Sequence, residues 1–98
     1  MDPTFEFDAE LWLHSGGSWV FIAVPEDESD EILDVVPATG GFGSVRVEVS
    51  IGSSIWRTSV FPSKELGCFV LPVKKPIRKK EGLDIGDTAS VSLTVLMT

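Results

Sequence analysis

The sequence predicts one small, mainly β domain: a double-split β-barrel with two short helical caps. Apolar and polar residues alternate along much of the chain, which is typical of half-buried strands. Glycine-containing turns separate two pairs of these strands. The order β-β-α-β also occurs twice within the 98 residues. Two such halves, related by a pseudo-twofold axis, would close one barrel over residues 1–98 and remove most exposed strand edges.

The first predicted hairpin lies near the N-terminus. Apolar residues at every second position from Phe5 to Leu13 indicate a strand, and Ser18 to Pro25 supplies its partner. Glycines 16 and 17 fit the turn because glycine accepts positive φ. The resulting register pairs apolar residues of the core face: Ala9 with Val24, Leu11 with Ile22, and Leu13 with Val20.

A short helix is predicted after this hairpin. The acidic residues 26–31 precede an apolar pattern at 32–36, and acidic side chains favour the positive end of a helix dipole. Pro37 should stop the helix, and residues 39–43 form a glycine-rich connector. This connector lacks the Gly-Lys-Ser/Thr of a phosphate-binding loop, so it predicts no nucleotide cofactor.

The second predicted hairpin turns at Gly52-Ser53, with glycine first. Its register places Glu48 opposite Arg57, an opposite-charge pair. Pro62 is expected to end this hairpin's second strand. The core face then pairs Val45 with Val60, Val47 with Thr58, and Val49 with Trp56.

The last third contains a strand at 67–73, a basic helix or turn at 74–81, and a final strand at 88–96. Pro76 is compatible with a helix only in its first turn. So small a domain needs nearly every apolar strand position for packing. We therefore expect the alternating residues of two strands to be buried: Val45, Val47, Val49, Val91, Leu93 and Val95.

Composition narrows the classes of function. The net charge of −7 disfavours non-specific nucleic-acid binding, which needs clustered Lys and Arg. One cysteine, Cys68, excludes an intrachain disulfide and fits a reducing compartment. No apolar run has the length of a membrane span, and residues 1–7 do not resemble a signal peptide. The expected location is the cytoplasm.

The sequence predicts no catalytic residues, no metal site and no cofactor. The single histidine, His14, and Cys68 lie on different predicted strands, and an apolar strand favours a packed, inert thiol. Tetrahedral zinc sites need several Cys or His ligands, which the chain lacks. The acidic run 26–31 lacks the spacing and central glycine of a calcium-binding EF-hand loop.

Four aromatic residues share the outward face of the first hairpin: Trp12, His14, Trp19 and Phe21. Exposed aromatic patches are costly, so one interpretation is that the apolar helix face formed by Ile32, Leu33 and Val36 covers them. The other interpretation is a ligand or partner surface, because tryptophan is enriched at binding hot spots.

The basic segment is a second candidate site, centred on Lys74, Lys75, Arg78 and Lys79. Together with Lys80, these residues are five of the eight basic residues of an acidic chain. On a helix, spacings of three and four place Lys75, Arg78 and Lys79 on one face, suited to a phosphate, a carboxylate or an acidic partner. The alternative is a solvated basic helix that only offsets the acidic body of the chain, or that pairs with residues 26–31.

Two stretches resemble a known bacterial family. They are Leu71-Pro72-Val73-Lys74-Lys75-Pro76-Ile77-Arg78, followed by Gly82-Leu83 and Gly86-Asp87, and the N-terminal Phe5-x-Phe7 and Trp19-x-Phe21-x-Ala23-Val24-Pro25. Together they resemble the DUF1905 family, a domain of unknown function often found with a YdeI/OmdA-like bacteriocin-protection domain. The resemblance implies a double-split barrel similar to those of AbrB- and MazE-like regulators, with no assigned activity.

The leading functional hypothesis is a non-enzymatic binding or accessory module that recognises an anionic ligand or a protein partner. The first alternative is an AbrB/MazE-like DNA-binding or antitoxin-type regulator, which rests on fold analogy and is opposed by the net charge. The second is a small enzyme with a barrel pocket. The sequence leaves the oligomeric state open.

Overall fold

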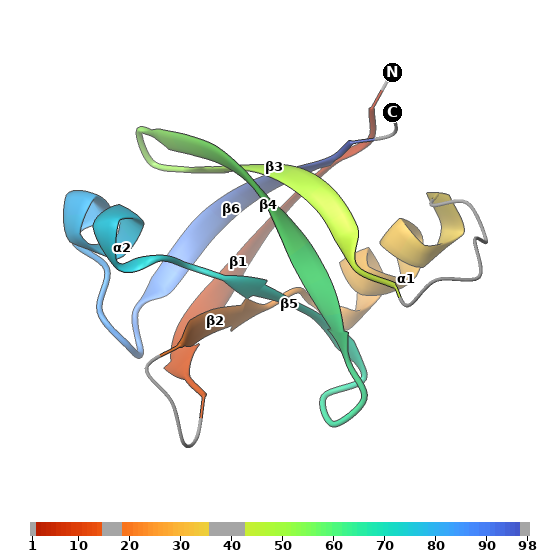
Figure 1. The fold of residues 1–98 in the computed structure, drawn as a ribbon, viewed down its shortest axis with the longest axis horizontal. Coiled ribbons are helices and arrows are strands. Elements are labelled where there is room, and N and C mark those ends of the chain that lie inside the picture. Colours follow the sequence, from red (N-terminus) through yellow and green to blue (C-terminus); the bar gives the residue numbers. More distant parts are fainter. Residues whose placement is uncertain (1, 15–18, 36–42, 97–98) are drawn as a thin grey trace.

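The computed structural model describes residues 2–14, 19–35 and 43–96 and contains one closed antiparallel barrel (Figure 1). Around the barrel the strand order is β1-β2-β5-β4-β3-β6. A helix lies on each side of the barrel, and the two helices are at opposite ends of the long axis of the view (Figure 1). The mainly β barrel with two helical caps is therefore confirmed. The elements are β1 (Thr4–Leu13), β2 (Val20–Ala23), α1 (Glu26–Val35), β3 (Val45–Ile51), β4 (Ser54–Ser63), β5 (Cys68–Pro72), α2 (Lys75–Glu81) and β6 (Thr88–Val95).

The predicted pseudo-twofold relation is present in the strand order. Exchanging β1 with β4, β2 with β5, and β3 with β6 leaves every neighbour relation in the ring unchanged. The β2–β5 ladder is centred on Ile22 opposite Leu71, so a shift of 49 residues relates the two strands. The same shift takes the first residue of α1, Glu26, to the first residue of α2, Lys75. Two copies of one β-β-α-β plan therefore build the barrel.

The core fills the barrel with the inward residues of all six strands. Every residue of the predicted buried set lies in the core, at 7% exposure or less: Val45, Val47, Val49, Val91, Leu93 and Val95. The second hairpin has the predicted register, including Glu48 opposite Arg57, and Gly52 opens its turn with φ of 58°. The first hairpin pairs Leu11 with Ile22 and Leu13 with Val20, as predicted, although Leu13 itself is exposed.

Two local expectations are wrong. Ala9 pairs with Ala89 of β6 and not with Val24, because β1 pairs with β6 up to Glu10 and with β2 only from Leu11 to Leu13. Pro62 lies inside β4, opposite Phe69, and does not end the strand. The β3–β4 ladder stops at Val60, so Pro62 has a neighbouring strand on one side only. Proline is tolerated at such an edge position because no ladder bond requires its missing N–H.

Each helix closes one part of the barrel. Ile32 of α1 is fully buried in the core, and Ile77 of α2 packs against the core together with Leu83. Ser29 ties α1 to the strands: its Oγ donates to the carbonyl of Val24 at 3.1 Å and accepts from the Phe69 N–H at 3.1 Å. The helices are thus fixed by one apolar anchor each and by specific hydrogen bonds.

Glu81, the last residue of α2, holds the β3–β4 turn. Its carboxylate accepts from the Ser53 N–H at 3.2 Å, from Ser53 Oγ at 3.0 Å and from Ser54 Oγ at 2.6 Å. The turn favours glycine for its positive φ, and a Cβ at Gly52 would also displace the Glu81 carboxylate from these hydrogen bonds. The hydrogen bond from Ser54, and then those from Ser53, lower the pKa of Glu81.

Glu81→Gln is expected to destabilise the fold more at neutral than at acidic pH. Because the folded-state pKa is lowered, the stabilisation is complete above the ordinary glutamate pKa of about 4.3 and is lost as pH falls through the lowered value. Urea denaturation of both proteins from pH 7 to pH 3 measures this. The exposed Glu65→Gln is the control, and it should change the free energy of unfolding at neutral pH by no more than about 0.5 kcal/mol. A constant difference for Glu81→Gln would contradict the expectation.

Candidate functional site

The basic cap, which comprises Lys74 and α2, is held in place by its backbone. Lys74 is the N-cap in an extended conformation, with φ −67° and ψ 151°, and Pro76 occupies the first turn, where its missing N–H costs nothing. At the other end Gly82 adopts the left-handed conformation, and the Leu83 N–H donates to the carbonyl of Arg78 at 2.9 Å. The proline and glycine together limit the helix to residues 75–81.

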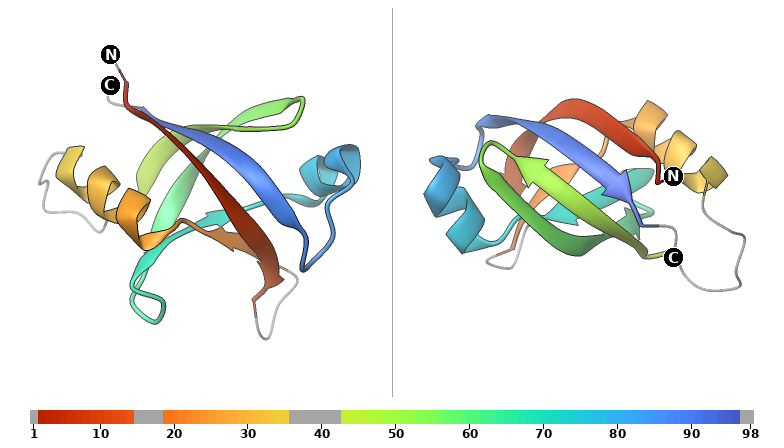
Figure 2. Two further views of the ribbon diagram at one scale, coloured as in Figure 1. Left: turned by 180° about the vertical axis from the view of Figure 1, so that it is seen from behind. Right: turned by 90° about the horizontal axis from the view of Figure 1, so that it is seen from above.

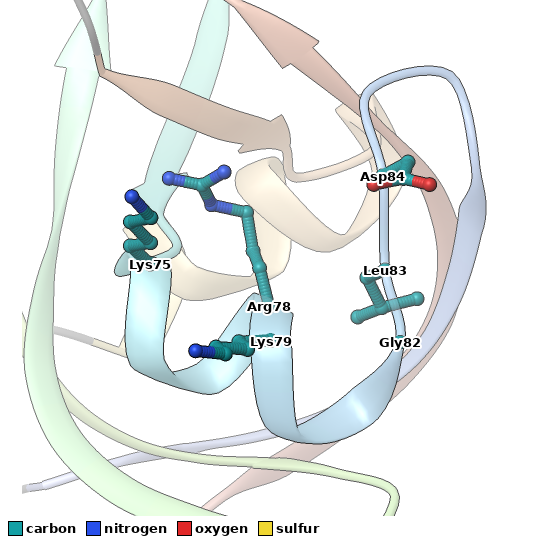
Figure 3. Close-up of a pocket in the computed structure, with 6 residues that line it drawn as sticks. All are labelled: Lys75, Arg78, Lys79, Gly82, Leu83 and Asp84. Atoms are coloured by element: carbon teal, nitrogen blue, oxygen red, sulfur yellow. The ribbon is translucent and has the colours of Figure 1, made fainter.

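Three basic side chains of this cap line one open hollow. Lys75, Arg78 and Lys79 border a space of about 350 Å³ together with Gly82, Leu83 and Asp84. In Figure 3, Lys75 and Arg78 extend from the helix in the same direction, whereas Asp84 lies apart from them on the following loop. The helical spacing inferred from the sequence therefore brings these three residues together.

The cap lacks a carboxylate partner within the described residues. The sole ion pair among residues 2–14, 19–35 and 43–96 joins Arg57 to Glu48 at 3.5 Å, on the exposed face of β3 and β4. The alternative that the basic segment pairs with residues 26–31 is wrong for this chain, because α1 and α2 lie at opposite ends of the barrel (Figure 2). Lys75, Arg78 and Lys79 keep their charges available to an external anion.

The aromatic surface formed by Trp12, His14, Trp19 and Phe21 is a contiguous cluster. Ring centroids lie 5.6 Å apart for Trp12 and Phe21, 5.7 Å for His14 and Phe21, and 6.1 Å for Trp12 and His14. Trp19 lies nearly parallel to Phe21, at 15° and 6.2 Å, and 58% of Trp19 is exposed. The grouping predicted from strand alternation is therefore present.

The expectation that α1 covers this cluster is wrong. Ile32 points into the barrel core, and Leu33 is 58% exposed; Val36 lies outside the described residues. The helix packs near β5 at the far end of the ladder from Trp19. The buried apolar residue of this amphipathic helix, Ile32, packs on the barrel core and not on the aromatic surface.

The apolar surface extends further than the sequence indicates. Trp19 and Phe21 line a shallow groove of about 300 Å³ with Phe61, Val70 and Pro72, which come from β4 and β5. Strand alternation places Phe61 on an outward face, but only the β2–β5 and β4–β5 pairings bring it toward Trp19. Sequence analysis missed these three residues because those pairings are not local.

The structure gives no support to a Cys–His catalytic pair. His14 lies beside Trp19, whereas Cys68 begins β5 at the opposite end of the ladder. The intervening stretch from Cys68 to Val73 spans about 17 Å at about 3.4 Å per residue. Burial, and then the Glu26 carboxylate, raise the pKa of the Cys68 thiol, which disfavours the reactive thiolate.

In the described part of the chain, no group of three or more His, Cys, Asp or Glu side chains is placed to hold a metal ion. No helix among the same residues has the length and apolarity needed to cross a membrane.

The comparisons with known proteins agree with the sequence resemblance. The family model "Domain of unknown function (DUF1905)" matches residues 7–93, a range that includes every residue of both candidate surfaces. No curated protein matches the chain. Because the match spans nearly the whole barrel, the chain belongs to the DUF1905 family.

Proposed function

We propose that the protein is a non-enzymatic binding module whose basic cap binds an anionic ligand or an acidic partner. The observation that carries the proposal is the hollow bordered by Lys75, Arg78 and Lys79, which have no carboxylate partner among the described residues. Ammonium and guanidinium groups that converge on one open space form charge-assisted hydrogen bonds with phosphate or carboxylate oxygens. Such bonds contribute more than neutral ones.

The charge of the rest of the protein favours binding of a small anion at the basic cap over binding of a long polyanion. The chain carries a net charge of −7, and its acidic helix lies at the other end of the barrel. A long polyanion would meet that acidic surface, whereas a small anion or one acidic side-chain cluster contacts the cap alone. The proposal therefore favours a ligand with few charges.

A titration followed by amide chemical shifts tests the proposal. Inorganic phosphate and a short polyglutamate peptide are added at low salt, and we expect shifts confined to residues 74–84. The double variant Lys75→Gln/Arg78→Gln should weaken binding by about tenfold or more, because it removes two charge-assisted contacts.

The matched control neutralises Arg46 and Lys64 to glutamine, two exposed residues outside the cap. This variant changes the net charge equally and should bind as wild type does. Shifts absent from residues 74–84 with both probes would overturn the proposal, as would equal losses in the two double variants. Duplex DNA in the same titration tests a regulator of the DNA-binding type.

A further inference from the structure

The basic cap and the aromatic surface meet at one end of the β2–β5 ladder. Phe21 pairs with Pro72, and the Val73 N–H continues the ladder by donating to the Val20 carbonyl at 2.9 Å. Lys74 remains extended, so the same register places it opposite Trp19. Neighbouring strands are about 4.8 Å apart, and alternation turns both side chains toward the outer face.

Trp19 has an aromatic neighbour on its other side. The His14 N–H donates to the Trp19 carbonyl at 2.9 Å, so the outer face presents His14, Trp19 and Lys74 across three adjacent chain segments. The rings of Trp19 and Phe21 are stacked, with planes 15° from parallel and centroids 6.2 Å apart. The Trp19 ring remains accessible, because 58% of Trp19 is exposed.

Arg78 is fixed at the same corner. Its Nε donates to the carbonyl of Val73 at 3.1 Å, immediately before Lys74. The pseudo-twofold equivalent of this contact is the bond from Ser29 Oγ to Val24, at 3.1 Å, so both halves of the barrel use one anchoring position. Ser29 Oγ makes two hydrogen bonds within the fold. The two Nη groups of Arg78 make none with the described residues, so they can donate to a ligand. A guanidinium held in this way loses little freedom when it binds an anion.

From this juxtaposition we propose that the surface formed by Trp19, Lys74 and Arg78 binds a nucleotide-like ligand, which is a planar ring that carries a phosphate. The ring stacks on Trp19, and the phosphate oxygens accept from Arg78 and Lys74. The proposal rests on the anion-binding function of the cap and names its ligand class. The exposed ring of Trp19 selects a planar heterocycle over an acidic peptide, since a peptide carboxylate needs no stacking surface.

The experiment compares four probes with the folded chain: AMP, ribose 5-phosphate, inorganic phosphate and adenosine. We expect AMP to bind about tenfold or more tightly than ribose 5-phosphate, because base stacking on an aromatic side chain adds to the phosphate contacts. Trp19→Ala should remove this difference and leave the affinity for phosphate unchanged. Trp19→Phe should restore part of it, and Arg78→Gln should weaken the binding of all three phosphate-bearing probes.

Leu66→Ala is the control, since Leu66 is an exposed apolar side chain in the turn between β4 and β5 and borders neither the groove nor the basic hollow. It should leave AMP affinity unchanged. A short single-stranded oligothymidylate identifies the source of the nucleotide: tighter binding than AMP with a steep salt dependence assigns a nucleic-acid strand, and equal or weaker binding assigns a free nucleotide.

The two proposals fail in different ways. If phosphate and AMP bind equally at residues 74–84 and Trp19→Ala has no effect, the anion-binding function stands and the nucleotide inference is overturned. If none of the four probes shifts residues 74–84, the nucleotide inference is overturned, and if the polyglutamate peptide also causes no shift there, the anion-binding function is overturned as well. Urea denaturation of each variant verifies that the fold is intact.

Discussion

Replacing Leu93 by alanine is expected to lower the free energy of unfolding by about 2–5 kcal/mol. Leu93 is fully buried in the core. It lies opposite Phe5 of β1 on one side and opposite Val49 of β3 on the other. Truncation leaves a cavity bordered by three strands of a closed barrel, which cannot collapse around it without breaking ladders. Urea denaturation at neutral pH measures the change.

Leu33→Ala is the control for this truncation. It removes the same atoms from a side chain that is 58% exposed on α1, so the free energy of unfolding should change by no more than about 0.5 kcal/mol. Equal effects at positions 93 and 33 would mean that Leu93 does not occupy the barrel interior.

Ser29→Ala is expected to cost about 1–3 kcal/mol of stability, although it removes a single oxygen atom. Ser29 is 2% exposed, and its Oγ is the acceptor for the Phe69 N–H at the start of the β2–β5 ladder. Without it, that buried donor loses its partner, and the cost of an unsatisfied buried group exceeds that of a lost surface bond.

Two measurements make this expectation specific. Hydrogen exchange at the Phe69 amide should accelerate in the variant more than at other β5 amides. Ser90→Ala, which removes an exposed bond to Asp8, should change the free energy of unfolding by no more than about 0.5 kcal/mol. Unchanged exchange at Phe69 together with unchanged stability would show that another group satisfies the donor.

Local patterns predicted much of this fold. The Gly52-Ser53 turn determines the register of β3 and β4, because a tight turn and an apolar alternation together permit only one pairing. The basic cap was predictable for the same reason: Pro76 and Gly82 mark its ends, and helical spacing gathers Lys75, Arg78 and Lys79.

Contacts between segments that are distant in the sequence could not be predicted from local patterns. Nothing near Phe61 or Pro72 in the sequence indicates that they border a groove with Trp19, since that depends on how β2 and β5 pair. The contact of Glu81 with the turn at Ser53 and Ser54 links residues 28 and 27 positions apart. The error about α1 has the same origin, because its apolar face has two possible surfaces to cover and only the closed barrel decides between them.

The pseudo-twofold axis relates backbone positions of α1 and α2 that carry opposite charges. The shift of 49 residues that superimposes the ladders takes Glu26 to Lys75, Asp30 to Lys79 and Glu31 to Lys80. The barrel is consequently an electric dipole, negative at α1 and positive at α2. In the field of an approaching anion this dipole experiences a torque that turns the basic end forward, although the net charge of −7 repels the anion at longer range. Such steering raises association rates and fades as added salt shortens the Debye length from about 30 Å at 0.01 M to about 8 Å at physiological ionic strength.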